Sequence, residues 1–318
     1  MSAEQVLAPL ILDERRSATQ AAADLRACVR GQVRVDESMR RHTTFRIGGP
    51  ADIFVVPQAL EDLVAVVRFA QEKGLPLKLV GNGSNLLVGD RGVRGLVVRL
   101  TPNFSEVHWR EEGVVVGAGR RLQVLLKEAA QVGRSGLESL VSIPGTVGGA
   151  LVMNAGTDVG TIGDLVVGAT VVDERGEVRR LEREQLGYRY RDSLLRAGTW
   201  VVVEAELRLT PAPPQEVQAK MDRLRLKREG RQPLSAWSAG SAFKNPRGVA
   251  AGKVLERAGA KGIRIGDAQV SRKHANFIIN RRRARAAEVR ALMEWAQALA
   301  LRRYEIDLEP EIEQVGEA

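Results

Sequence analysis

The segment Val80-Gly81-Asn82-Gly83-Ser84-Asn85-Leu86-Leu87-Val88 decides how the fold is interpreted, and it follows a short apolar strand predicted over Leu77–Val80. Glycines let successive backbone N–H groups converge on an anion, and Ser84 and Asn85 add side-chain donors. The dinucleotide pattern G-x-G-x-x-G fails because residue 86 is leucine, and the lysine of a P-loop is missing. Taken alone, the loop is as typical of a tight turn as of a phosphate site.

A second glycine-rich loop follows about sixty residues later, with the sequence Ser142-Ile143-Pro144-Gly145-Thr146-Val147-Gly148-Gly149-Ala150. A backbone without side chains lets a flat ring or a pyrophosphate approach closely. Two such loops are harder to explain as turns than one. Together they indicate a crevice that holds a long ligand.

Around these loops the sequence predicts a mixture of strands and helices without regular βαβ alternation, which defines an α+β fold. Pro211, Pro213 and Pro214 mark the clearest boundary between domains. Strands are predicted over 53–56, 77–80, 95–100, 114–118, 166–172, 177–181, 200–209, 275–280 and 305–313. Helices are predicted over 61–73, 121–132, 215–229, 250–258 and 286–303.

Composition narrows the function classes. The 318 residues are 44% apolar and carry a net charge of +9, but the basic residues are scattered among 39 acidic ones, which favours a solvated surface over a nucleic-acid site. A single cysteine and three scattered histidines predict no metal site. No apolar run reaches the roughly 18–20 residues of a membrane span, and no secretory pattern begins the sequence, so we expect a soluble, cytoplasmic protein.

Beyond these local features, the segment 80–88 with Asp90 and Gly92 resembles the FAD-binding domain of vanillyl-alcohol-oxidase-like flavoproteins. Within that group the chain resembles the UDP-N-acetylenolpyruvoylglucosamine reductases. The resemblance covers residues 33 to 316, and its motifs recur in order. They are Arg46-Ile47-Gly48-Gly49-Pro50-Ala51-Asp52, segment 143–150 with Asn154-Ala155-Gly156, Tyr190-Arg191-Asp192-Ser193, segment 239–246, segment 271–277 and Leu308-Glu309-Pro310-Glu311-Ile312.

This resemblance implies a two-lobed FAD-binding domain of the vanillyl-alcohol-oxidase/PCMH type, followed by a smaller α+β substrate-binding domain. We expect a helical extension over 1–30, the FAD-binding domain over 31–213 (subdomains about 31–100 and 101–213) and the substrate domain over 214–318. The implied reaction uses noncovalent FAD and NADPH to reduce the enolpyruvyl group of a UDP-sugar, a precursor of peptidoglycan. The implied partners are these small molecules, with no nucleic acid or membrane, and a monomer is favoured. The short interval between Arg191 and Ser241 fits the family's shorter, second subtype.

The family's cofactor contacts carry over to both glycine loops and to flanking positions. Family members often have a tyrosine two residues after Asn-Ala-Gly, whereas this chain has Asp158, so no contacts are carried over to 157–161. The implied FAD-binding residues are Arg46, Gly48, Gly81, Asn82, Gly83, Ser84, Asn85, Leu86, Ser142, Ile143, Pro144, Gly145, Thr146, Gly148, Gly149, Ala150, Asn154, Ala155 and Gly156.

Three residues are implied as catalytic. Arg191 would hold the substrate carboxylate, since a guanidinium grips a carboxylate at two points. Ser241 would donate a proton to carbon, and Glu311 would assist the enolate oxygens, in its protonated form. The residues alone would not select them: Arg189 would share a strand face with Arg191, and Glu311 sits in an acid–apolar alternation that is typical of a solvated edge strand.

Four residues are implied as substrate-binding: Tyr190, Lys227, Lys244 and Asn245. Of the basic residues, Lys227 and Arg231 are the weaker candidates for the diphosphate. On general grounds a surface role is as common for lysine and arginine.

Three other functions agree with parts of the sequence. Ser241-Ala242-Phe243-Lys244 satisfies the S-x-x-K pattern of penicillin-binding enzymes, but their Ser-Asp-Asn and Lys-Thr-Gly motifs are missing, so this function is rejected. An FAD-dependent sugar or alcohol oxidase of the same fold is the main alternative, with His42 as a position for covalent flavin. A basic nucleic-acid-binding protein without flavin is the third.

Overall fold

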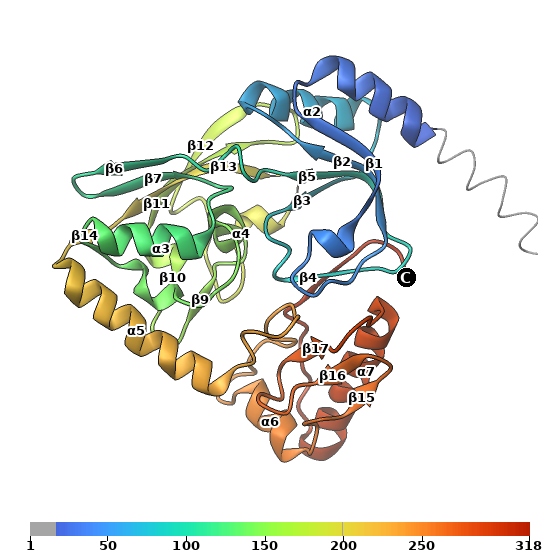
Figure 1. Cartoon of the computed structure of the whole chain (residues 1–318), viewed down its shortest axis with the longest axis vertical. Coiled ribbons are helices and arrows are strands. Elements are labelled where there is room, and N and C mark those ends of the chain that lie inside the picture. The colour runs from blue at the N-terminus through green and yellow to red at the C-terminus, as the bar shows by residue number, and fades with distance from the viewer. Residues whose placement is uncertain (1–16, 199) are drawn as a thin grey trace, which may run out of the picture.

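The computed structural model describes residues 17–198 and 200–318; most of the predicted extension, residues 1–16, lies outside this range. The described part of the extension forms a helix over 17–28. Two sheets lie on one side of the molecule and a helix-rich unit on the other (Figure 1). This mixture confirms the α+β class.

The first sheet has four strands in the order β1 (Gln32–Ser38), β2 (Pro50–Val56), β5 (Val93–Arg99) and β3 (Leu77–Val80). β1 is antiparallel to β2, whereas β2 and β3 both run parallel to β5. Parallel pairing needs a crossover, and α2 (Leu60–Glu72) supplies it between β2 and β3. The helix 17–28 and α2 lie together at the outer end of this sheet (Figure 1). Leu63 and Val66 of α2 are fully buried, as its helical spacing predicts.

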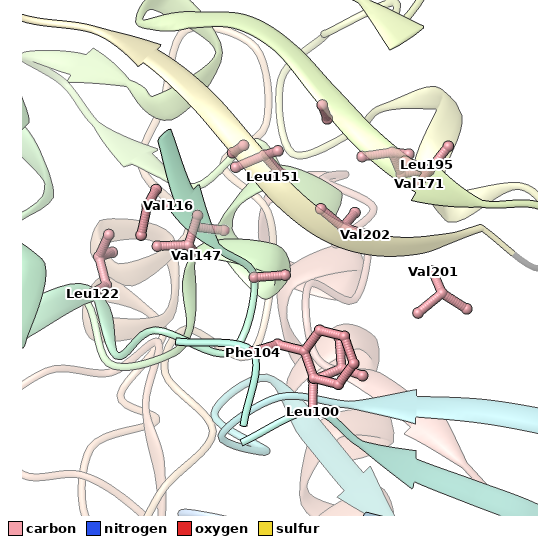
Figure 2. Close-up of a cluster of buried hydrophobic side chains, with 14 of the residues drawn as sticks. Leu100, Phe104, Val116, Leu122, Val147, Leu151, Val171, Leu195, Val201 and Val202 are labelled. Atoms are coloured by element: carbon pink, nitrogen blue, oxygen red, sulfur yellow. The ribbon is translucent and has the colours of Figure 1, made fainter. Parts of the chain in front are cut away.

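The second sheet is antiparallel, with five strands in the order β12 (Val178–Glu182), β11 (Val166–Val172), β13 (Val201–Arg208), β7 (Gly113–Gly117) and β6 (Val107–Arg110). α3 (Leu122–Gln131) and the short α4 (Val147–Val152) pack against it. Both sheets share a single hydrophobic core. Figure 2 shows part of it: Leu100 and Phe104, which follow β5, face Val201 and Val202 of β13. This shared core fixes the two glycine loops relative to each other.

The third unit contains α6 (Ala251–Arg257), α7 (Ala286–Tyr304) and a small sheet of β15 (Arg264–Ile265), β16 (Ala268–Val270) and β17 (Ile278–Asn280). The stripe predicted for the last helix is buried: Val289, Leu292, Met293, Ala296, Leu299 and Ala300. Phe45, Ile47 and Leu87, from the first part of the chain, join this second core. Asp90 accepts hydrogen bonds from the N–H groups of Ala286 and Ala287 at 2.8 and 3.0 Å and so caps α7 from outside.

The predicted strand over 305–313 is wrong. Residues 305–309 form no strand, and the strand in this region is β18 (Glu313–Val315). β18 lies parallel to β4 (Leu86–Val88), directly after the first glycine loop. The segment before it pairs instead with the chain near Ser241, since Phe243 forms an isolated bridge with Pro310. The alternation of acidic and apolar residues over 305–313 therefore did not predict which segments this part of the chain pairs with.

α5 (Pro214–Arg231) begins at the predicted proline boundary. Its buried residues Val217 and Met221 belong to the core of the two sheets, so its first turns pack on the preceding domain. The helix then runs toward the third unit (Figure 1). The domain limits remain a prediction. Two short strand pairs complete the fold: β8 (Arg134–Ser135) with β14 (Thr210–Pro211), and β9 (Gly156–Thr157) with β10 (Gly160–Thr161).

Candidate active site

A cavity of ≈ 1590 Å³ lies where the two sheets and the third unit meet. Its wall is built from both glycine loops, the segment around Arg191, the second half of α5, Ser241 and Glu311. Of the predicted cofactor-binding residues, those at 81–86, 142–146, 148–150, 155 and 156 line it. The fold thus brings together two loops that the sequence separates.

The first loop is closely packed against the backbone around it. Gly83 has φ +60°, and a Cβ there would lie 2.0 Å from the carbonyl oxygen of His42. A Cβ on Gly81 would lie 2.5 Å from Oγ1 of Thr146, in the second loop. Both positions therefore need glycine, since a side chain would displace backbone or the neighbouring loop.

The two loops also contact each other directly. Oγ of Ser84 donates to the carbonyl oxygen of Pro144 at 3.0 Å. Within the described residues, no group accepts a hydrogen bond from the N–H of Asn82, Gly83 or Ser84. Adjacent unpaired N–H groups on residues that line a cavity suit the oxygens of a pyrophosphate. The residues present therefore fit a dinucleotide such as FAD.

Four residues predicted to bind ligands lie outside the cavity lining. The Arg46 guanidinium lies 4.1 Å from the centre of the Trp237 ring, and Gly48 packs against Val88 and Met39. The Asn154 side chain donates to the carbonyl oxygen of Arg189 at 2.8 Å and accepts from the N–H of Gly163 at 3.1 Å. Lys244 forms an ion pair with Glu309 at 2.6 Å. Their ligand contacts stay predictions, and each residue has a structural contact of its own.

Arg191 and Glu311 meet in the cavity, although 120 positions separate them. Nε of Arg191 donates to Oε1 of Glu311 at 2.7 Å, and Nη2 donates to the carbonyl oxygen of Gly156 at 2.8 Å. Arg191 has φ +54°, a strained backbone for a residue with a Cβ. Arg189 also lines the cavity, but the pairing with Glu311 belongs to Arg191.

Glu311 is not on a solvated acidic face, so the edge-strand interpretation is wrong for this residue. Its side chain is only 15% exposed. Burial raises the pKa of Glu311 above its ordinary value, and Arg191 and Lys244 lower it only in part. A carboxyl group with a raised pKa keeps its proton at higher pH and can then donate a hydrogen bond.

Ser241 lines the same cavity and is held by backbone on both sides. It forms an isolated bridge with Phe277. The next residue, Ala242, accepts a hydrogen bond from the N–H of Glu311 at 2.9 Å. Ser241 and Glu311 are therefore neighbours across two adjacent backbone segments.

The second half of α5 adds positive charge to the wall of the cavity. Nζ of Lys227 lies 3.8 Å from Oδ2 of Asp158, and Nη1 of Arg228 donates to the carbonyl oxygen of Val141 at 2.8 Å. Burial lowers the pKa of Arg228 below its ordinary value. Arg228 was not among the predicted residues, because nothing local distinguishes it from the basic residues beside it. Tyr190 and Asn245 line the cavity together, and the Tyr190 hydroxyl accepts from the N–H of Asn245 at 3.3 Å.

His42 lies outside the cavity lining and is 9% exposed. Its Nε2 is 2.8 Å from Glu37, its Nδ1 is 2.8 Å from Nη1 of Arg99, and its ring stacks on Phe54. Both ring nitrogens are therefore engaged, which argues against a covalent flavin bond at this position.

Comparison with known proteins bears on the identity of the chain. A family model for the FAD-binding domain matches residues 51–182, and the C-terminal-domain model of UDP-N-acetylenolpyruvoylglucosamine reductase matches residues 232–315. The UDP-N-acetylenolpyruvoylglucosamine reductase of Moorella thermoacetica is 48% identical over 303 residues, covering 94% of this chain and 98% of its own length. The chain belongs to the UDP-N-acetylenolpyruvoylglucosamine reductase family.

Other members of this family agree in length and structure. The reductase of Agathobacter rectalis is 42% identical, with 89% of this chain and 93% of the relative covered. The crystal structure of the reductase from Thermus caldophilus matches with a TM-score of 0.78 and 37% identity, covering 90% of this chain and 99% of that one. Membership in this family confirms the predicted resemblance, and it decides against the sugar or alcohol oxidase.

Two further results concern the parts of the chain that are described. None of the helices there is both long and apolar enough to cross a membrane. No group of three or more His, Cys, Asp or Glu side chains in residues 17–198 and 200–318 is placed to hold a metal ion.

Proposed function

We propose that this chain uses NADPH to reduce the enolpyruvyl group of UDP-N-acetylglucosamine enolpyruvate, giving UDP-N-acetylmuramate, with Arg191, Ser241 and Glu311 as catalytic residues. These residues are assigned together because three separate segments of the chain bring them to the same part of the cavity. The glycine loops lie at the same cavity.

FAD, when bound, accepts hydride from NADPH and donates hydride to the substrate. The residues that would hold it are the loops 81–86 and 142–150, through the unpaired N–H groups of the first loop and through the space that the glycines leave. The protein's remaining tasks are to orient the substrate and to manage charge and protons.

Arg191 and Glu311 would act on the carboxylate of the enolpyruvyl group. When the terminal carbon gains hydride, negative charge develops on the adjacent carbon and on the carboxylate oxygens. The Arg191 guanidinium can form two hydrogen bonds to these oxygens, and a protonated Glu311 can donate another. The raised pKa of Glu311 supports this role because it favours the protonated form.

Ser241 would then donate its hydroxyl proton to the carbon next to the carboxylate. The carbon gains a C–H bond, the electron pair of the enolate forms it, and the serine oxygen recovers a proton from solvent. A positioned general acid contributes about 10²–10⁴ in rate. A serine is a weak acid, but an enolate carbon is a strong base.

The basic residues of α5 would bind the diphosphate of the UDP-sugar. Lys227 and Arg228 line the cavity, as do Tyr190 and Asn245. Lys244, which pairs with Glu309 outside the lining, is the weakest of the predicted substrate contacts. Because NADPH and nucleotide sugars are cytoplasmic metabolites, we place the reaction in the cytoplasm.

The test separates the two halves of the reaction. Ser241→Ala is expected to keep flavin bleaching by NADPH within about twofold, and to slow re-oxidation by the enolpyruvyl substrate by about 10²–10⁴, the contribution of a general acid. Ser235→Ala is the matched control, because Ser235 is exposed and lies outside the cavity lining. If bleaching and re-oxidation fall equally while flavin stays bound, Ser241 is not the acid.

A further inference from the structure

Asn276 is a buried residue whose side chain holds the segment that carries Ser241. The residue is 3% exposed. Its amide oxygen accepts from the N–H of Phe243 at 3.0 Å, and its amide nitrogen donates to the carbonyl oxygen of the same residue at 2.8 Å. One side chain therefore pairs with both backbone polar groups of one residue, as a neighbouring β-strand would.

The backbone of Asn276 adds a third bond to the same segment. Its carbonyl oxygen accepts from the N–H of Ala242 at 2.7 Å. On the opposite side, the carbonyl oxygen of Ala242 accepts from the N–H of Glu311 at 2.9 Å. Ala242 is thus the link between Asn276 and Glu311, and Ser241 lies one residue before this link.

Few other contacts could hold Ser241 in place. Gly240, just before it, has φ +79° and no atom within 4 Å of where a Cβ would lie, so the chain enters from an open and flexible position. After Ser241, the next two residues are fixed by Asn276, with Glu311 and Pro310 on the far side. Ser241 itself forms an isolated bridge with Phe277, the residue after Asn276, so the placement of Ser241 depends on this bridge and on the bonds that follow it.

We propose that Asn276 is a positioning residue, which directs the Ser241 hydroxyl toward the substrate carbon by clamping the backbone of Ala242 and Phe243. The inference rests on the proposed role of Ser241 as the acid. Proton transfer requires correct placement within a fraction of an ångström, and a displacement of about 1 Å can cost on the order of 10²-fold in rate. Hydride transfer from NADPH needs no proton from Ser241.

The first test is Asn276→Leu in the FAD-loaded enzyme, because leucine has a similar size and forms no hydrogen bonds. Bleaching by NADPH should stay within about twofold, whereas re-oxidation by the enolpyruvyl substrate should slow about 10–100-fold. Asn276→Asp keeps an acceptor for the N–H of Phe243 and loses the donor, so it should lie between the wild type and Asn276→Leu. This second variant provides the measurement if the leucine variant does not fold.

Asn280→Leu is the matched control. Asn280 is also buried, at 5% exposed, and its side chain also bonds only to backbone: it donates to Phe45 at 2.9 Å and accepts from Arg282 and Ala284. None of these bonds reaches the Ser241 segment. Asn280→Leu should lower the stability of the protein while slowing neither half-reaction selectively.

A double-mutant cycle separates positioning from general destabilisation. In a Ser241→Ala background the hydroxyl that Asn276 directs is gone, so adding Asn276→Leu should change re-oxidation by less than about threefold. A full 10–100-fold loss in that background, or equal slowing of both half-reactions by Asn276→Leu alone, overturns the positioning role while the role of Ser241 stands. If Ser241→Ala itself keeps full turnover, both proposals fail.

Discussion

Replacing Glu311 by glutamine tests whether burial or the pairing with Arg191 has the larger effect on the pKa of this carboxyl group. Burial raises the pKa of Glu311 in the folded protein above its ordinary value of 4.5, because the side chain is only 15% exposed and Arg191 offsets the cost of burial only in part. The folded protein therefore binds this proton more tightly than the unfolded chain does. The stability gained from binding this proton is fully present below the pKa of the unfolded chain. It is lost as the pH rises through the pKa of the folded protein.

Glutamine is uncharged at every pH and can still accept the hydrogen bond from Arg191. The stability of Glu311→Gln relative to the wild type should therefore rise with pH above about 4.5, by up to about 1.4 kcal/mol for each pH unit, until the folded pKa is passed. Above that point the difference becomes constant. The glutamine amide can still donate a hydrogen bond to the developing oxyanion, so re-oxidation by the enolpyruvyl substrate should slow by less than the about 10²–10³ that the loss of one donor costs.

The assay is urea unfolding at pH 5, 6, 7 and 8 with a fixed excess of FAD, so that cofactor binding stabilises both proteins in the same way. Glu309→Gln is the control, because it makes the same substitution two residues away, at a side chain that is 69% exposed. If the wild type instead gains stability relative to Glu311→Gln as the pH rises, attraction to Arg191 outweighs burial. Glu311 would then be a permanent carboxylate, and its role as a proton-bearing donor would be refuted.

Two further predictions concern glycine and helix capping. Gly83→Ala should weaken FAD binding at least tenfold in a fluorescence titration, because its Cβ would lie 2.0 Å from the backbone of His42; Gly74→Ala, with a similar φ of +62° and no atom within 4 Å, should leave FAD affinity unchanged. Equal losses in the two variants would contradict the packing argument. Asp90→Ala should lower the free energy of unfolding by about 1–2 kcal/mol in urea, since it removes the cap of α7, and an unchanged midpoint would show that water replaces the cap.

The sequence predicted well what depends on local patterns. The glycine loops were recognisable because small residues at close spacing followed an apolar strand, and the helices because their apolar stripes repeat at helical spacing. The last helix, predicted over 286–303, spans Ala286–Tyr304 with its stripe buried. Such features are properties of short segments, so the sequence contains them directly.

What the sequence could not show are contacts between distant segments. Glu311 looked like one of several solvated acids, because its partner Arg191 lies 120 positions earlier. Arg228 was overlooked for the same reason: its contact, the carbonyl oxygen of Val141, lies 87 positions away. Only the motifs shared with the reductase family selected Arg191 and Glu311 in advance. Asn276 and Phe243 also lie in such motifs, over 271–277 and 239–246, but the contact between them was not predicted.

The pairing of β18 with β4 has a consequence for how ligands reach the cavity. β18 ties the segment after Glu311 to the strand after the first glycine loop, and Ala242 ties Glu311 to the Ser241 segment. A domain-opening motion that moved the third unit away from the two sheets would have to break these backbone hydrogen bonds. We therefore expect NADPH and the sugar nucleotide to enter and leave through an opening that needs no such motion, while the reacting groups keep their spacing throughout the cycle.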